Sequence, residues 1–189
     1  AGPNFRYERA QRGRYRQFDQ VGMEALGSED PYLDVEVISV AWRFYEALGL
    51  KNVNLLLNSM GTAHDRSRYM EALSEYFANQ KGDLSKESQD TFVANPLRVL
   101  DSKRDEDAQV IAEAPSILDH LSDEANDHFI KVQEGLENLG IPYSVEPKLV
   151  RGLDYYLKTT FEFISESIDA AQDAIGGGGR YDGLAAEMG

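Results

Sequence analysis

The chain has 189 residues, a formal net charge of −14 and no cysteine, which excludes disulfides and thiolate metal sites within it. Its length suits one sizeable core, or one core with a smaller attached lobe. The histidines are scattered, so we predict surface or capping roles for them and no protein metal site; they are His64, His120 and His128. No segment approaches the length of a transmembrane helix, and the first residues lack the apolar core of a signal peptide. We therefore predict a cytoplasmic protein with no membrane partner.

The charge is unevenly distributed along the chain. Residues 1–16 hold five arginines and one acid, a local charge of +4 that leaves −18 for the remainder of the total of −14. The arginines are Arg6, Arg9, Arg12, Arg14 and Arg16, and the acid is Glu8. The acidic total argues against broad nucleic-acid binding, while the basic start suggests a local anionic ligand such as a phosphate chain or an RNA end. A solvated basic strand is the alternative.

The first 61 residues predict a hairpin, a helix and a strand. Residues 3–9 and 14–24 have extended character with a loop tip at 11–13, which would place Arg6 and Gln20 on neighbouring strands. Apolar residues then recur at helical spacing from Pro31 to Leu48 and stop before Gly49. Residues 53–57 follow as a strand with one well-buried face.

The remaining chain divides into a helical part and a second β-rich part. Residues 62–140 predict an inserted helical lobe, with helices over 67–79, 105–112 and 122–139. From residue 141 the β signal returns, followed by a polar turn over 165–175, a four-glycine run and a helix that opens at 180–184. We therefore predict an α+β fold with three segments: core residues 1–61, the insertion 62–140 and core residues 141–189.

Three segments carry candidate chemistry. The first runs from Phe5-Arg6-Tyr7-Glu8-Arg9 to Gln20-Val21-Gly22-Met23-Glu24, where arginine forks could hold a phosphate or carboxylate and Gln or Glu could hold an ammonium or a ring N–H. An amphipathic hairpin is its structural alternative. The second is Leu149-Val150-Arg151-Gly152-Leu153-Asp154-Tyr155-Tyr156, either a cation with aromatic neighbours or ordinary strand residues with an arginine at the rim.

The third segment is the glycine run Gly176-Gly177-Gly178-Gly179 followed by Arg180-Tyr181-Asp182. Consecutive glycines allow the backbone to approach a ligand closely. A dinucleotide-binding fingerprint would need spaced glycines after a parallel strand, whereas these glycines are contiguous and the preceding region has antiparallel character. A glycine turn before a helix is the other alternative.

Taken together, the three segments resemble the histidyl-tRNA synthetase family of class II aminoacyl-tRNA synthetases. The first is similar to motif 2 in its histidine-specific form, F-R-x-E-R-P-Q-x-G-R-Y-R-Q-F-x-Q. The others resemble the signatures L-V-R-G-L-D-Y-Y and G-G-G-R-Y-D-G-L, in the same order and with a helical insertion between the first two. Ala10 and Asp19 depart from the motif, at positions to which we assign no ligand contact.

The resemblance implies part of a class II antiparallel β-sheet with flanking helices, and roles for particular residues. It implies Arg6 and Arg151 as catalytic cations at the α-phosphate and the histidine carboxylate. The implied histidine-binding set is Arg6, Gln20, Glu24, Arg151, Tyr155 and Tyr156. The implied ATP-binding set is Arg6, Glu8 and Arg14, and Gly178, Gly179 and Tyr181 are expected near the substrate.

The resemblance also implies substrates and partners. These are histidine, ATP, Mg²⁺ arriving with ATP, tRNA(His), and a second copy of the full-length parent in a homodimer. Because motif 1, motif 3 and the anticodon-binding domain have no counterpart here, we expect a catalytic-core piece that is inactive alone. Two non-catalytic relatives remain as alternatives: the regulatory subunit of histidine biosynthesis and the synthetase-like domain of tRNA-sensing kinases.

Overall fold

The computed structural model describes residues 1–7, 15–150, 155–165 and 174–184. The strands are β1 (Gly2–Phe5), β2 (Gln17–Gln20), β3 (Val53–Ser59), β4 (Ser144–Val145), β5 (Leu157–Ser165) and β6 (Ala174–Arg180). The α-helices are α1 (Pro31–Ala47), α2 (Ala63–Asn79), α3 (Lys86–Ala94), α4 (Ala108–Glu113) and α5 (Asp123–Asn138). Short 3₁₀ turns lie at η1 (Lys81–Asp83), η2 (Pro96–Asp101), η3 (Asp105–Asp107) and η4 (Ile117–His120). The predicted α+β class is confirmed.

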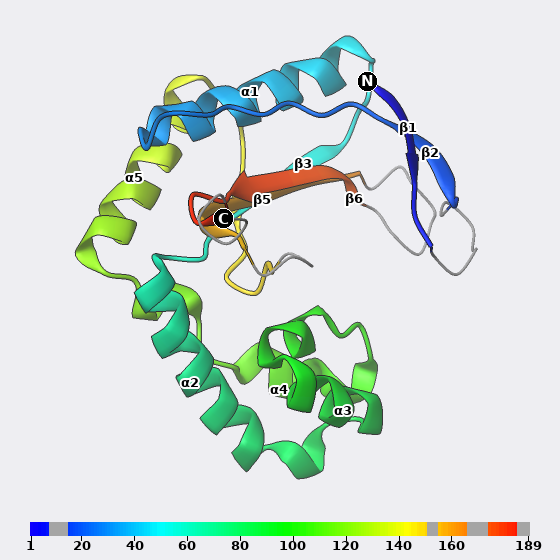
Figure 1. Cartoon of the computed structure of the whole chain (residues 1–189), viewed down its shortest axis with the longest axis vertical. Helices are drawn as coiled ribbons and strands as arrows, with labels where there is room; N and C mark the ends of the chain where they lie inside the picture. The colour runs from blue at the N-terminus through cyan, green and yellow to red at the C-terminus, as the bar shows by residue number, and fades with distance from the viewer. Residues whose placement is uncertain (8–14, 151–154, 166–173, 185–189) are drawn as a thin grey trace.

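A four-stranded sheet in the order β4-β3-β5-β6 forms the centre of the fold. The β3–β5 and β5–β6 pairs are antiparallel, and only the short β4 runs parallel to its neighbour β3. Helices α1 and α5 cover one face of this sheet (Figure 1). Their apolar residues pack with Leu55, Leu57, Phe161 and Phe163 of the sheet in one buried cluster. The β1–β2 hairpin forms a separate two-stranded sheet beside it.

Helices α2, α3 and α4 form a second, separate core. Tyr69, Leu73 and Phe77 of α2 are fully buried there and pack with residues of η2, α4 and η4. Helix α5 instead packs on α1 and the sheet, although its sequence lies inside the segment predicted as the insertion. The proposed boundaries at residues 62 and 140 therefore remain a prediction. The helical core includes residues of η4, which precedes α5 in the chain.

Both chain connections between the sheet and the helical core meet at the side chain of Asp65. Its carboxylate accepts hydrogen bonds from the backbone N–H of Thr62, at 2.9 Å, and from the hydroxyl of Ser122, at 2.8 Å. Thr62 is the N-cap of α2 and Ser122 is the N-cap of α5. Arg68 adds an ion pair to the same carboxylate, at 3.1 Å. One buried carboxylate thus joins the entry to the helical core and the exit from it.

Several predicted elements differ from the observed ones at their ends. The helix predicted over 67–79 begins at Ala63, because Thr62 and Asp65 form a capping box. The helix predicted over 105–112 is a 3₁₀ turn followed by α4, and α3, capped by Ser85, was not predicted. The predicted helices over 31–48 and 122–139 are confirmed to within a residue at each end. The loop tip at 11–13 lies outside the described residues.

The glycine run is a strand, so its interpretation as a turn before a helix is wrong. Residues 176–179 lie inside β6 and pair with Phe163, Glu162, Phe161 and Thr160 of β5. The β-branched and aromatic residues of β5 favour an extended strand, whereas glycine does not. Hydrogen bonding to β5 therefore holds the glycines in extended conformation. The tertiary pairing therefore overrides the local preference of glycine for turns.

Replacing Asp65 should destabilise the chain in a pH-dependent way. Burial raises the pKa of Asp65, but hydrogen bonds from Thr62 and Ser122 outweigh this and lower the pKa from 3.8 to about 2. A carboxyl whose folded-state pKa is lowered contributes stability that is complete above the unfolded pKa and lost as the pH falls through the folded one. We expect Asp65→Asn to lower the free energy of unfolding by about 2 kcal/mol at neutral pH.

Urea unfolding followed by circular dichroism at a series of pH values measures this effect. The difference between the wild type and Asp65→Asn should shrink as the pH falls from 3.8 to about 2. Asp90→Asn, at an exposed position of α3, serves as the matched control and should change little at any pH. A difference for Asp65→Asn that stayed constant down to the lowest pH would contradict the role of its charge.

Candidate active site at the end of the glycine strand

Glu24 and Tyr181 come together although they lie 157 positions apart in the sequence. The Tyr181 hydroxyl donates a hydrogen bond to the Glu24 carboxylate. Tyr181 directly follows β6, and Glu24 lies in the coil between β2 and α1. This contact joins the end of the first predicted segment to the end of the third. A carboxylate and a phenol side by side can serve both nitrogens of a bound ring.

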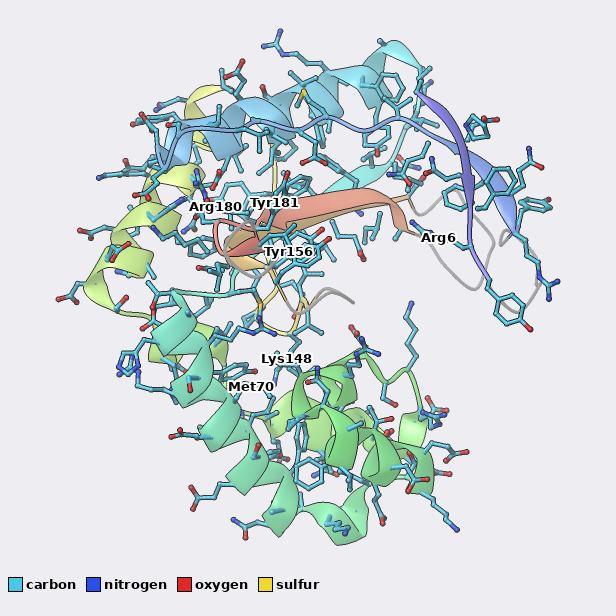
Figure 2. All side chains as sticks on the ribbon, viewed as in Figure 1. Arg6, Met70, Lys148, Tyr156, Arg180 and Tyr181 are labelled. Carbon is cyan, nitrogen blue, oxygen red and sulfur yellow. The ribbon has the colours of Figure 1, made fainter. Side chains whose placement is uncertain are left out.

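Three tyrosines gather at the same place. The rings of Tyr155 and Tyr156 lie 4.8 Å apart between centroids, and Tyr155 meets Tyr181 edge-on at 6.0 Å. Figure 2 shows Tyr156 and Tyr181 close together in front of the sheet. The end of the second predicted segment, at Tyr155 and Tyr156, therefore lies beside the contact between the first and third segments. An aromatic wall with three hydroxyl groups suits a flat, polar ligand.

The glycines of β6 serve the two faces of the sheet in alternation. A Cβ on Gly178 would approach the Phe161 ring to 2.9 Å, within the core beneath α1 and α5. A Cβ on Gly179 would lie 2.7 Å from the Thr159 carbonyl oxygen and 2.8 Å from the Tyr156 ring. Gly179 therefore lets the Tyr156 ring lie directly over the backbone. Gly178 makes room for the core, and its proximity to substrate stays a prediction.

Arg180 fixes the end of β6 against the first turn of α1. Its Nε and Nη2 contact Asp34 Oδ1 at 3.1 and 2.9 Å. Its Nη1 donates to the Ser28 carbonyl at 3.0 Å and to Asp182 at 3.0 Å, and Nη2 donates to the Asp30 carbonyl at 3.1 Å. The side chain is 5% exposed. Burial lowers the pKa of Arg180, but Asp34 and Asp182 raise it further, so the guanidinium stays charged.

A buried histidine contacts the same aspartate as this arginine, so the surface or capping role predicted for His128 is wrong. His128 of α5 is 6% exposed, and its Nε2 lies 3.2 Å from Asp34 Oδ2. Burial lowers the pKa of His128, and Asp34 opposes that shift less strongly. We therefore assign a neutral imidazole at neutral pH. Asp34 then has one permanent cationic partner, Arg180.

Arg6 and Gln20 lie on the β1–β2 hairpin, as predicted, but at different points along it. Gly2 pairs with Gln20, whereas the backbone N–H of Arg6 donates to the Arg16 carbonyl at 2.9 Å. Paired residues lie on the same face of a sheet, and every second residue of a strand returns to that face. Arg6, four residues after Gly2, therefore projects to the same side as Gln20, roughly 13 Å from it along the strand. The Arg6 guanidinium lies 4.7 Å from the centroid of the Phe18 ring. Figure 2 shows Arg6 well apart from Tyr156 and Tyr181.

Three predicted site residues, Glu8, Arg14 and Arg151, lie outside the described residues. The chain that leads to Arg151 is nevertheless well anchored. Lys148 Nζ donates to the carbonyls of Ile111 and Ala114 at 2.5 and 2.7 Å, at the end of α4. Val150 is buried in the helical core. The second segment is therefore attached to the helical lobe up to the residue before Arg151.

Sequence reasoning missed the residues that support the site. Arg180 was noted only as part of the glycine segment, and Asp34 is a single acid in the first turn of an amphipathic helix. It also missed the polar strip on the sheet face opposite α1 and α5, where Asn58 pairs with Thr160 and Leu56 with Glu162. The mixture of Asn and Leu in residues 53–58 is the one signal that could have revealed this strip.

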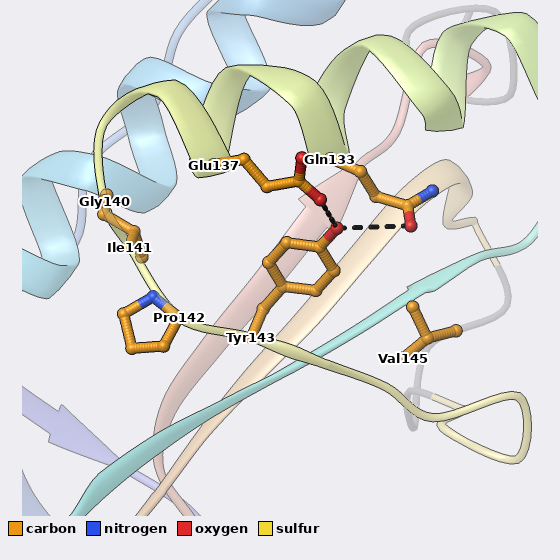
Figure 3. A pocket seen from close by; sticks show the side chains of 7 residues that line it. All are labelled: Gln133, Glu137, Gly140, Ile141, Pro142, Tyr143 and Val145. Carbon is orange, nitrogen blue, oxygen red and sulfur yellow. Dashed lines mark hydrogen bonds between the residues drawn. The ribbon is translucent and has the colours of Figure 1, made fainter.

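A surface hollow lies away from these residues. It has a volume of about 580 Å³ and lies between the end of α5 and β4 (Figure 3). Its lining residues are Gln133, Glu137, Gly140, Ile141, Pro142, Tyr143 and Val145. The Tyr143 hydroxyl donates to Glu137 at 2.8 Å, and burial, together with this hydrogen bond, raises the pKa of Tyr143 to about 12. With an acid and no cation in its lining, the hollow does not suit a phosphate ligand.

Neither a protein metal site nor a membrane span is found in the part of the chain that the structure describes. No group of three or more His, Asp or Glu side chains there is arranged to hold a metal ion. None of its helices combines the length and the apolar character needed to cross a bilayer.

Comparison with known proteins decides the family. The family model described as Histidyl-tRNA synthetase matches residues 1–189. The chain belongs to the histidyl-tRNA synthetase family. Curated family members named histidine–tRNA ligase include that of Picosynechococcus sp., 54% identical over 188 residues, and that of Geobacillus kaustophilus, 50% identical over 190 residues. Both alignments cover 100% of this chain, which spans 44% and 45% of the two relatives.

Solved structures agree with this family membership. The apo histidyl-tRNA synthetase of S. aureus superimposes with a TM-score of 0.71 at 38% identity, over 97% of this chain and 43% of that one. A protein from Bacillus halodurans described as an ATP phosphoribosyltransferase regulatory subunit/histidyl-tRNA synthetase matches with a TM-score of 0.58 at 21% identity, over 98% of this chain and 51% of that one. The second match supports the fold alone. The predicted class II antiparallel sheet with flanking helices is confirmed by the first.

Replacing Gly179 by alanine should destabilise the sheet. The new Cβ would lie 2.7 Å from a backbone oxygen, which cannot move aside as a flexible side chain could. Overpacking of this kind costs about 1–3 kcal/mol, which corresponds to roughly 2–12 °C in Tm for a chain of this size. Gly82→Ala is the matched control, because a Cβ there meets nothing within 4 Å. Thermal unfolding of both variants measures the effect, and equal Tm values would contradict the close approach.

Proposed function

We propose that the full-length protein containing this chain is a histidine–tRNA ligase. It would activate histidine with ATP to give histidyl-adenylate and pyrophosphate, and then transfer histidine to tRNA(His). The observation that carries this proposal is a chain of contacts: Glu24 meets Tyr181, Tyr181 meets Tyr155, and Tyr155 packs on Tyr156, whose ring lies against Gly179. Three segments far apart in sequence supply a carboxylate and phenols at one place, which suits an imidazole ring.

The imidazole of histidine has one N–H donor and one acceptor nitrogen. We propose that Glu24 accepts a hydrogen bond from the ring N–H and that Tyr156 pairs with the other nitrogen. Tyr181 holds the Glu24 carboxylate, and Tyr155 forms part of the wall. Gln20 would bind the α-amino group. A site that pairs both ring nitrogens rejects side chains that lack them, because its own polar groups would be left unpaired.

Adenylate formation needs fixed positive charge. A carboxylate oxygen of histidine attacks the α-phosphorus of ATP, the bond from that phosphorus to the α–β bridging oxygen breaks, and pyrophosphate leaves with the electron pair. Two anions meet in this step, so cations aimed at the α-phosphate lower its barrier. We propose Arg6 and Arg151 as these cations. Arg6 and Gln20 lie on the same face of the hairpin.

The remaining ATP contacts are proposed at Glu8 and Arg14, near the adenine and the terminal phosphates. Mg²⁺ enters with ATP as part of the substrate. In the second step, a ribose hydroxyl at the tRNA 3′ end attacks the carbonyl carbon of the adenylate, and AMP leaves. We further propose that the full-length protein is a cytoplasmic homodimer, the state expected of the family.

A non-catalytic, synthetase-like binding protein is the alternative function. The presence together of Arg6, Gln20, Glu24, Arg151 and Tyr156 in the sequence favours the enzyme, because a protein that had lost aminoacylation would not need the whole set. Histidine-dependent ATP–pyrophosphate exchange by the full-length protein separates the two. Exchange that requires histidine supports the ligase, whereas histidine or tRNA binding without exchange would show a binding protein.

Arg151→Ala in the full-length protein should lower the rate of adenylation by about a hundredfold or more, because a charge contact to the transition state is lost. Histidine affinity should change less. Arg151→Lys should restore little of the rate, since lysine lacks the planar fork of the guanidinium. Exchange kinetics of both variants measure this, and near-normal turnover in the alanine variant would remove Arg151 from the mechanism.

Glu24→Gln should weaken histidine binding and leave ATP binding nearly unchanged. The substitution keeps the size of the side chain but removes the charge that would hold the ring N–H. Loss of a charged hydrogen-bond partner costs about 1.5–3 kcal/mol, or roughly 10-fold to 150-fold in Kd. Separate calorimetric titrations with histidine and with ATP test this. Equal losses for both ligands would indicate general misfolding instead.

A further inference from the structure

The coil from residue 21 to residue 30 carries Glu24 but has little packing of its own. Every residue in it is exposed. Gly27 turns the chain with a φ of 92°, a conformation that other residues rarely adopt. Exposed coil without buried apolar contacts is held weakly by itself. The position of Glu24 therefore depends on the polar contacts at the two ends of the segment.

Arg180 makes the contacts at the end nearest α1. Two of its N–H groups donate to the carbonyls of Ser28 and Asp30, at 3.0 and 3.1 Å. The residue that follows Arg180 in the chain is Tyr181, which donates to Glu24. One guanidinium thus holds the chain just after Glu24 and also fixes the backbone that presents the partner of Glu24. The positions of both Glu24 and Tyr181 thus depend on the side chain of Arg180.

We propose that Arg180 is a positioning residue for histidine recognition, which holds Glu24 and Tyr181 in register for the imidazole ring. This inference rests on the proposed function for the identity of the ligand. Arg180 does not touch the ligand itself, since its side chain is 5% exposed and points to the first turn of α1 (Figure 2). It acts by fixing the distance between two groups that do.

The planar fork of arginine is required for this role. Arg180 contacts two carboxylates, Asp34 and Asp182, and two backbone carbonyls with three nitrogens at 2.9–3.1 Å. The carboxylates balance the buried charge, and the carbonyls locate the coil. Lysine would keep the charge but could not reach both sets from one ammonium group. Arg180→Lys therefore separates the positioning role from the charge balance.

The test uses the full-length protein with Arg180→Lys, alone and combined with Glu24→Gln. We expect Arg180→Lys to raise the KM for histidine about tenfold or more, and to change the KM for ATP by less than about twofold. In the Glu24→Gln background the same substitution should raise the KM for histidine by less than about twofold, because the contact that Arg180 positions is already lost. Equal factors in both backgrounds, or equal effects on the two substrates, would overturn the proposal.

Arg68→Met is the matched control for loss of an anchoring arginine. Arg68 also contacts a carboxylate, Asp65, and a backbone carbonyl, that of His120, but lies in the helical lobe. Its substitution should leave the KM for histidine unchanged. If Arg68→Met raised this KM as much as Arg180→Lys does, the effect would be one of general stability, and the positioning role would be overturned.

A measurement without substrate distinguishes failure of this inference from failure of the proposed function. Wild-type protein without histidine-dependent exchange would refute the ligase, but not the contact. With 3-fluorotyrosine in place of Tyr181, the Glu24→Gln substitution should shift the ¹⁹F resonance when Arg180 is present. In the Arg180→Lys background the same substitution should leave the resonance unchanged. An unchanged response in Arg180→Lys would show that Glu24 and Tyr181 meet without Arg180, and would overturn the inference.

Discussion

The buried guanidinium of Arg180 constrains the whole region around it. A buried cation is costly unless its charge and all its donors are met. Asp34 and Asp182 supply the charge, and the carbonyls of Ser28 and Asp30 accept the remaining donors. Asp34 belongs to α1, and Ser28 and Asp30 belong to the coil before it, so these contacts hold the end of β6 beside the start of α1. The orientation of α1 on the sheet and the course of the coil that carries Glu24 follow from this constraint.

The glycines of β6 meet a second constraint, because close packing is needed on both faces of the sheet. On one side Gly178 leaves space for the Phe161 ring within the core under α1 and α5. On the other side Gly179 leaves space for Tyr156 over the backbone. A side chain at either position would push the sheet away from one layer or the other. Consecutive glycines therefore allow a tight core and a close approach by the aromatic wall in a single strand.

The sequence predicted the elements with strong periodicity and missed those that depend on tertiary contacts. The helix from Pro31 and the helix before Leu139 follow from apolar spacing and caps, which are local signals. The strand at the four glycines could not be predicted locally, because β5 imposes it. Glu24 and Tyr156 follow from the motifs, but the contact of Glu24 with Tyr181 is long-range and has no local signal. Asp34 carries no local signal, since an acid in a first helical turn is ordinary.

The central claim of the proposed function is that the Glu24 carboxylate and the Tyr156 hydroxyl bind the two ring nitrogens of histidine. The most direct measurement is ¹⁵N NMR of ring-labelled histidine bound to the full-length protein. The account predicts that Glu24→Gln shifts the resonance of one ring nitrogen and Tyr156→Phe shifts that of the other. Bound resonances that respond to neither substitution would contradict the account.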